Sequence, residues 1–509
     1  ANIVAGLGVT GAGIGDGNYI ASITNSTTFE LQVAASATAT NVTLTFYSRT
    51  SNSVAIGTDA LTAVTTGISN VAVGHEALTA VTTGDKNIGV GHSAGTSITT
   101  GEHNIAIGYQ ALDAEDAHGY NLAIGSFALT TLDAGANGNN TAVGYNAGNA
   151  MTTGTANTLL GHGSGDATDD GANNTAVGYL SLSANCGNDN VAVGYQALMS
   201  STGANNVAIG ASALGTATTA ASNVFIGKGA GSAIPAGQAL ASCVAIGINA
   251  FNGAGGTTND AVGTIAIGDS ACFELTTGIG NVAIGYQALD AEDDGDYNTA
   301  IGYQALTAQT GTTGTVANTA VGYRAGRNIT KGRYNIAIGS GALETDDVGD
   351  ASIAIGYQAL SSQNSDSDNE TTANIGIGYY AGWYNVTGQN NTWLGYSAGF
   401  GATGQSNSNN TGIGYHALKA VTTGDDNTTV GKGSGESITT GSDNTYIGSN
   451  AGSGLDAESN NVAIGRQALK VTGAIANAVV IGYQAANTGG TITTGCLLYT
   501  SPSPRDGLL

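Results

Sequence analysis

Charged side chains are scarce in this chain of 509 residues. Asp, Glu, Lys and Arg make up 9% of it, against roughly 25% in ordinary globular domains. The 12 basic and 36 acidic residues give a formal net charge of −24, so we expect repulsion from nucleic acid and from anionic membrane surfaces. No run approaches the ~18 apolar residues of a transmembrane helix. The sequence therefore predicts neither nucleic-acid binding nor membrane insertion.

Cysteine and proline are also rare, with four and three residues. Four cysteines are too few for a disulfide framework, and Cys186, Cys243 and Cys272 are expected to be free, small hydrophobic residues. The fourth, Cys496, opens a segment that holds two of the three prolines and breaks the repeat described next. Residues 496–509 resemble the translation of a sequencing adapter and are predicted not to be native.

What the chain has in abundance is glycine, 81 residues, set in a repeat. The unit reads Asn-Val-Ala-Ile-Gly-Tyr-Gln-Ala-Leu, as at Asn281–Leu289, and a polar stretch follows it. Twenty-five units start between residues 53 and 478, and 16 of the 24 spacings are 17 residues. With the Asn position as offset 0, offset 3 is always Ile, Val or Leu and offset 4 is always Gly. Short strands and tight corners on this period predict an all-β fold, a parallel β-solenoid of about 25 rungs.

Offset 2 of the strand carries the most informative pattern. It is Ala or Gly in 19 units and is never charged. Because offsets 1 and 3 share one face of the strand, we expect them to face the coil interior and offset 2 to point outward. An outward column of small residues indicates a seam between chains, so a homotrimer is predicted. The predicted seam residues are Ala72, Ala106, Ala192, Ala283, Ala300 and Ala354.

The run Asn-x-[Ala/Val]-[Ile/Val]-Gly-x-x-Ala resembles the head repeats of YadA-like trimeric autotransporters, and the longer unit is similar to repeats in phage tail-fibre proteins. The resemblance covers residues 53–495 and implies a left-handed β-roll of three chains. It also implies an extracellular location, on a virion tail fibre or a bacterial cell surface. We expect residues 51–495 to form the solenoid shaft or head. Residues 1–50 alternate like short antiparallel strands and are similar to small β modules of phage structural proteins.

Motifs typical of enzymes are weak in this chain. Gly6–Gly11 matches GxGxxG, but the glycines after it would not start the helix that a dinucleotide site needs. Gly91–Gly95 and Gly395–Gly399 match GxSxG only because of the repeat columns, and no helix is expected after either serine. No repeated acidic pair of the kind used by solenoid polysaccharide depolymerases projects from a strand column. We expect a protein that is not an enzyme and has no catalytic residue and no cofactor.

Two groups of residues offer metal ligands. His75 and His92 share offset 5 in successive units, but Tyr fills that column in 12 units, so surface rings are the simpler interpretation. The acidic turns Asp166–Asp170 and Asp290–Asp296 offer oxygen ligands for Ca²⁺. They lack a regular calcium-binding signature, and we expect solvated turns with no metal.

An aromatic window between residues 379 and 400 is the candidate receptor site. It holds seven aromatic residues, both tryptophans among them, and Trp393 is set aside because it occupies offset 2. The six candidates are Tyr379, Tyr380, Trp383, Tyr384, Tyr396 and Phe400. The predicted function is that of a structural fibre and host-attachment protein of a phage-like virion, binding a cell-surface glycan or protein. The head of a bacterial trimeric surface adhesin is the alternative. An ice-binding solenoid ranks last, because the Thr residues at offset 1 are expected to point inward.

Overall fold

The computed structural model describes residues 52–487, apart from 238–239, 254–260, 311–313, 366, 369 and 474, together with strands within residues 8–47 and at 497–499. The chain divides into two compact units, Ala1–Ala192 and Val193–Leu509, and each is described by itself. The described residues are all-β and form a parallel solenoid of about 24 turns with about 17 residues per turn. None of them belongs to a helix long and apolar enough to cross a membrane.

The strands described within the first 50 residues form two antiparallel pairs. Strand β1 (Gly8–Thr10) pairs with β4 (Thr45–Tyr47), and β2 (Ile20–Asn25) pairs with β3 (Thr28–Leu31). The antiparallel strands predicted for this stretch are thus confirmed where the structure describes it.

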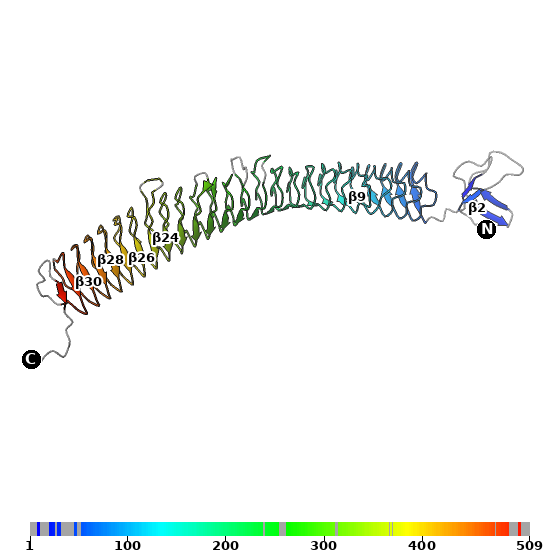
Figure 1. The fold of residues 1–509 in the computed structure, drawn as a ribbon. Helices are drawn as coiled ribbons and strands as arrows, with labels where there is room; N and C mark the ends of the chain where they lie inside the picture. The colour runs from blue at the N-terminus through cyan, green and yellow to red at the C-terminus, as the bar shows by residue number, and fades with distance from the viewer. Residues whose placement is uncertain are drawn as a thin grey trace, which may run out of the picture. The chain divides into compact units, whose positions relative to one another are not determined.

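The solenoid strands of the first unit are three residues long and pair in parallel with the strand of the next turn (Figure 1). Val71, for example, lies opposite Ile88, one repeat later. The strands are β5 (Val54–Ile56), β6 (Val71–Val73), β7 (Ile88–Val90), β8 (Ile105–Ile107), β9 (Leu122–Ile124), β10 (Thr141–Val143), β11 (Thr158–Leu160), β12 (Thr175–Val177) and, at the boundary of the units, β13 (Val191–Val193).

The second unit is built from strands of the same length, paired in the same parallel register, as in Ala283 opposite Ala300. A small side sheet joins β19 (Gly295–Asp296) to β21 (Gly314–Thr315). The solenoid strands are β14 (Val207–Ile209), β15 (Val224–Ile226), β16 (Val244–Ile246), β17 (Ile265–Ile267), β18 (Val282–Ile284), β20 (Thr299–Ile301), β22 (Thr319–Val321), β23 (Ile336–Ile338), β24 (Ile353–Ile355), β25 (Ile375–Ile377), β26 (Thr392–Leu394), β27 (Thr411–Ile413), β28 (Thr428–Val430), β29 (Thr445–Ile447), β30 (Val462–Ile464), β31 (Val479–Ile481) and β32 (Leu497–Tyr499).

The glycine at offset 4 ends each strand at a corner that no other residue fits. Gly322, for example, has a φ of +138°, which residues with a side chain rarely adopt. A Cβ atom at this position would lie 2.7 Å from the carbonyl oxygen of Gly339, the same corner one turn later. Both constraints recur along the column, and they explain why every unit has glycine there.

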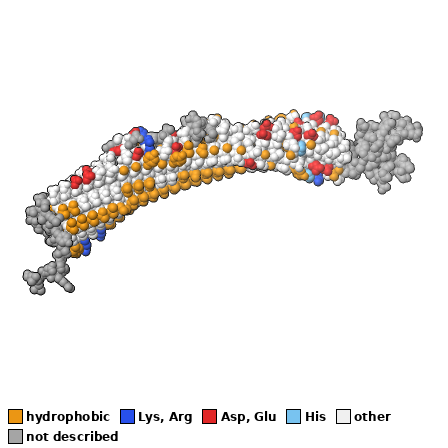
Figure 2. All heavy atoms as spheres, viewed as in Figure 1, with side chains coloured by type: hydrophobic (Ala, Val, Ile, Leu, Met, Phe, Trp, Pro, Cys, Tyr) orange, Lys and Arg blue, Asp and Glu red, His pale blue; other side chains and the backbone are white. Residues whose placement is uncertain are grey.

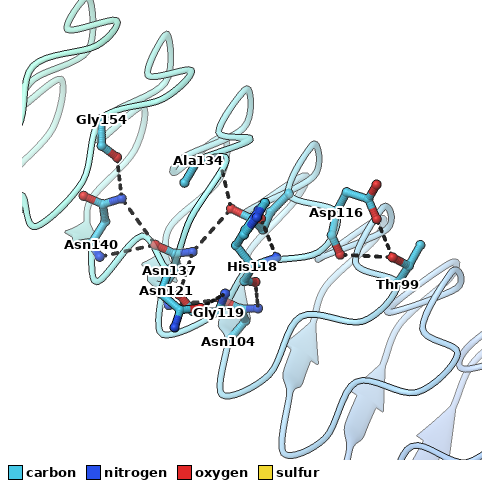
Figure 3. Close-up of polar contacts among 11 residues, drawn as sticks. Thr99, Asn104, Asp116, His118, Gly119, Asn121, Ala134, Asn137, Asn140 and Gly154 are labelled. Atoms are coloured by element: carbon cyan, nitrogen blue, oxygen red, sulfur yellow. Dashed lines mark hydrogen bonds and ion pairs between the residues drawn. The ribbon is translucent and has the colours of Figure 1, made fainter.

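The asparagine at offset 0 is buried and connects successive turns. The Oδ1 atom of Asn87 accepts the backbone N–H of Asn104 at 2.9 Å, and its Nδ2 atom donates to the carbonyl of Gly101 at 2.8 Å. In Figure 3, Asn121 likewise accepts the N–H of Asn140, and the Nδ2 atom of Asn140 donates to the carbonyl of Gly154. These hydrogen bonds satisfy polar groups that would otherwise be costly to bury.

Offset 2 lies inside the coil, so the predicted seam is wrong. The side chains of the six predicted seam residues are fully buried within one chain, while the residues at offsets 1 and 3 are half-buried or exposed. The alternation along the strand was predicted correctly, but its sense was inverted. The buried residues are Ala72, Ala106, Ala192, Ala283, Ala300 and Ala354. The space at offset 2 is narrow, because the buried Ala at offset 7 and the residue at offset 8, usually Leu, fill the facing side.

The larger residues at offset 2 reveal how tight this interior is. Five turns carry a side chain larger than Ala at offset 2 together with Gly at offset 8, as in Phe225 and Gly231. A Cβ atom on Gly231 would lie 2.6 Å from Cε1 of Phe225. The five pairs are Leu159 and Gly165, Phe225 and Gly231, Trp393 and Gly399, Thr429 and Gly435, and Tyr446 and Gly452.

We expect Phe225 and Gly231 to behave as a coupled pair. Phe225→Ala leaves a cavity and should cost about 3–5 kcal/mol. Gly231→Leu should also lower the melting temperature, because Leu overlaps the phenyl ring. The double variant recreates the Ala208 and Leu214 pair of the preceding turn, and Leu214 itself has a φ of +49°. Its melting temperature, followed by circular dichroism, should therefore exceed that of both single variants, and a lower value would contradict the pairing.

Candidate functional site

The outward face of the strands is an unbroken apolar surface within each unit. Offset 3 is Ile, Val or Leu in every turn, and these side chains remain accessible, as in Ile301, 37% exposed, and Leu394, 42% exposed. Figure 2 shows hydrophobic side chains in continuous rows over the edge that carries the strands. At about 4.8 Å per turn and ~7 Å per strand, the 16 strands from β14 to β31 present on the order of 500 Å². Isolated soluble proteins seldom expose a larger apolar patch.

This strand face was missed from the sequence because the inward and outward positions were exchanged. A signal in the sequence could have found it, because a large residue at offset 2 often occurs with Gly at offset 8. Two positions exchange volume in this way when their side chains fill the same interior space.

Offset 5 adds a column of stacked aromatic rings beside the strand face. Tyr357 and Tyr379 have ring centroids 5.1 Å apart, as do Tyr379 and Tyr396, and Tyr396 lies 5.3 Å from Tyr415. Another stack joins Tyr286, Tyr303 and Tyr323. The tilt between successive rings is small, so each tyrosine covers the faces of its neighbours and presents mainly its edge and its hydroxyl to solvent.

The structure brings the six candidate receptor residues into one cluster, as predicted. Tyr379 and Tyr396 are exposed, and the other four are half-buried. The set is linked by ring contacts among Tyr379, Tyr380, Trp383, Tyr384, Tyr396 and Phe400. Trp393 is fully buried in the coil, so it is absent from the cluster because it lines the interior and not because it forms a seam.

Trp383 is covered on both faces of its indole. Tyr380 lies 4.1 Å away with a tilt of 9°, and Tyr384 lies 4.7 Å away with a tilt of 10°. Two rings this near and this parallel would overlap each other on one face, so they occupy opposite faces. A sugar therefore has no free indole face to stack on, and a ligand would meet ring edges and tyrosine hydroxyls. Interaction with Tyr379 raises the pKa of Tyr380 to about 12, so that hydroxyl stays protonated.

A basic turn lies in the same columns as the aromatic cluster. Arg324, Arg327, Lys331 and Arg333 are four of the 12 basic residues of the chain. Arg324 shares offset 6 with Tyr380, and Arg327 shares offset 9 with Trp383, three turns or roughly 14 Å away along the stack. Sequence reasoning overlooked this turn, although the grouping of scarce positive charge marks it.

Two residues of the basic turn pair with nearby acids. Arg324 contacts Glu344 at 3.9 Å, and Lys331 contacts Asp368 at 2.6 Å. The guanidinium of Arg324 also lies 5.0 Å from the centre of the Tyr323 ring. The column from Arg324 to the aromatic cluster therefore combines aromatic edges, hydroxyl groups and positive charge.

The acidic turn at Asp290–Asp296 is not a wholly solvated one. Glu292 is fully buried, and its carboxylate accepts the N–H of Gly295 at 2.7 Å and the Nδ2 group of Asn298 at 3.2 Å. Burial, with Asp293 and Asp294 nearby, raises the pKa of Glu292 to about 7. The deepest carboxylate of this candidate calcium turn is thus bound by the chain itself.

The cysteines behave as predicted where the structure describes them. Cys186, Cys243 and Cys272 are free and buried, and burial raises the pKa of the Cys243 thiol to about 11.

No family model, curated protein or solved structure matches this chain.

We expect the stability of the chain to fall as pH rises, in part through Glu292. Its pKa is raised on folding from 4.5 to about 7, so its contribution is complete below about pH 4.5 and is lost as pH rises through 7. The shift corresponds to on the order of 3 kcal/mol. Glu292→Gln should reduce the difference in melting temperature between pH 5 and pH 8, because Gln309 already occupies the equivalent position one turn later. A variant that keeps the full wild-type difference would disprove this role.

Proposed function

We propose that the chain is a non-catalytic structural fibre and host-attachment protein of a phage-like virion, and that it works outside the cell as a homotrimer. The observation that carries this proposal is the strand face, a continuous apolar surface that one chain leaves uncovered. With the tyrosine column beside it, its extent approaches the ~800 Å² per partner of a standard protein interface. The head of a bacterial trimeric adhesin would use the same surface and remains the alternative.

A second copy of the chain is the occupant that matches this face best. The apolar side chains recur once per turn, about every 4.8 Å, and another copy aligned in parallel has the same spacing. Rotational symmetry lets every turn meet the equivalent turn of its partner. A globular partner has no such period. The choice of three chains follows from the resemblance to trimeric β-roll heads.

Host attachment is assigned to the aromatic cluster together with Arg324 and Arg327. Ring edges, tyrosine hydroxyls and guanidinium groups suit a cell-surface glycan that carries carboxylate, sulfate or phosphate groups. A net charge of −24 over the whole chain speaks against nucleic acid as the ligand.

Ice binding is a second candidate function. It ranked last because the Thr residues at offset 1 were expected to point inward, and that expectation was wrong. The Thr residues at offset 1 face outward, and four successive turns carry Thr392, Thr411, Thr428 and Thr445 opposite one another. Such a column, flanked by Ile and Val, forms a regular flat surface. A chain that stays monomeric and whose solution shows thermal hysteresis would favour this candidate.

Lysine in the strand face should prevent assembly without unfolding the coil. Ile284→Lys combined with Ile301→Lys places charges where chains would pack, and a desolvated unpaired charge is strongly unfavourable. Sedimentation velocity should report a trimer for the wild type and a monomer for the variant, with similar circular dichroism. Tyr297→Lys is the matched control, because Tyr297 is 54% exposed and lies outside the strand. A wild type that sediments as a monomer would sink the proposal.

Removing the stacked rings should abolish attachment while the fibre stays folded. We expect Trp383→Ala with Tyr384→Ala to bind host cells or anionic glycans at least ten-fold more weakly, at an unchanged oligomeric state. Tyr286→Ala with Tyr303→Ala removes a stacked pair outside the cluster and serves as the control. Equal attachment by the two folded double variants would rule the cluster out.

A further inference from the structure

Two histidines and a glutamate gather on the surface of the first unit. His75 and His92 occupy offset 5 in adjacent turns, with ring centroids 4.9 Å apart and a tilt of 23°. Glu76 follows His75 directly, and one ligand atom from each of the three residues lies within 4.8 Å of the others. We propose that His75, Glu76 and His92 bind a transition-metal ion such as Zn²⁺.

A buried serine organises this cluster. Ser93 is 6% exposed, and its hydroxyl donates to Oε2 of Glu76 at 3.1 Å. The same oxygen lies 2.9 Å from Nδ1 of His92. Because the single hydroxyl proton is engaged with Glu76, the hydrogen bond to His92 is donated by its Nδ1–H group. The neutral His92 ring then carries its lone pair on Nε2, and this nitrogen is free of the proton that would prevent it from binding a metal.

The same proton arrangement argues against a hydrolytic serine at this GxSxG match. A nucleophilic serine gives its proton to the histidine, whereas here the imidazole N–H donates to the serine oxygen. The network around Ser93 therefore orients a ligand and does not activate a nucleophile.

The ligand types select the class of ion. Two imidazole nitrogens and one carboxylate are typical of Zn²⁺ and neighbouring divalent metals, whereas Ca²⁺ prefers oxygen ligands alone. Bonds of about 2.0–2.1 Å require the ligand atoms to close by roughly 1 Å. The side chains of His75 and Glu76 are 47% and 42% exposed, which leaves them room to rotate. The Asp113 carboxylate of the next turn interacts electrostatically with Glu76 and His92 and adds negative charge beside the ion.

The other metal-ligand clusters of the described residues are less suitable. At Glu115, His118 and Asp133, the buried Glu115 carboxylate already accepts the N–H groups of His118 at 3.1 Å and Ala134 at 3.5 Å. The third cluster consists only of carboxylates, and Glu292 within it is bound to backbone N–H groups. The site at His75 leaves its ligand atoms accessible.

A metal held here would fasten two adjacent turns to each other. His75 and Glu76 precede His92 by one repeat, and the backbone joins the turns through the Ser93 N–H donated to the His75 carbonyl at 2.9 Å. An ion that binds only the folded chain raises its stability with concentration. Because this site lies in the first unit, the inference is independent of the proposed attachment surface.

Isothermal titration of the full chain with Zn²⁺ tests the site. We expect one ion per chain, no comparable binding of Ca²⁺, and at least a ten-fold loss of Zn²⁺ affinity in His75→Ala and in His92→Ala. Ser93→Ala should weaken binding about ten-fold without changing the melting temperature of the metal-free chain. The matched control is His103→Ala, since His103 only stacks on Tyr120 at 5.1 Å.

Cobalt gives a direct view of the ligands. The visible spectrum of the Co²⁺-loaded chain should show tetrahedral nitrogen and oxygen coordination that disappears in His92→Ala and persists in His103→Ala. The absence of Zn²⁺ binding, or equal affinity in the wild type and His92→Ala, would overturn the proposal.

Discussion

The width of the coil interior is the constraint on which the rest of this structure depends. A strand and its facing turn leave room for an alanine opposite a leucine, and five of the six larger residues at offset 2 occur with glycine at offset 8; Val480, with Ala486, is the exception. Phe225 with Gly231 and Trp393 with Gly399 are such exchanges. Most Val, Ile and Thr residues of the strands lie at offsets 1 and 3, so they face outward and form the apolar strand face. The surface proposed for assembly is thus a consequence of a narrow interior.

Buried polar side chains fill the parts of the coil interior that apolar side chains do not occupy. The asparagine ladder satisfies the backbone of each corner, as at Asn87 and Asn104, and so allows a stack whose turns have few apolar residues of their own. Glu292, Gln309 and Asp346 occupy another inward column and bond to the chain rather than to solvent. Acids in this column cost stability when ionised, which links the stability of the solenoid to pH.

Function in such a fold is distributed by columns, because each offset places equivalent side chains one strand spacing apart. In the column at offset 5 this produces stacked tyrosines in the second unit and the His75 and His92 pair in the first. Neighbouring columns then give these rings their partners. Trp383 lies between two tyrosines, while Ser93 relays a hydrogen bond from His92 to Glu76. Repetition builds the framework, and local departures from it create the candidate sites.

The sequence by itself determined the solenoid, its period, the glycine corners and the grouping of the six aromatic residues. These features follow from spacing alone, since residues one repeat apart must lie in register. The tertiary structure decided which face of the strand is inside, because the alternation that was used assigns Ala283 and Ile284 to opposite faces without saying which one the coil encloses. The packing of Leu289 and its equivalents against the strand makes that choice. The covered faces of the Trp383 indole and the hydrogen bonds of Ser93 likewise depend on the directions of the side chains, which cannot be inferred from the repeat spacing.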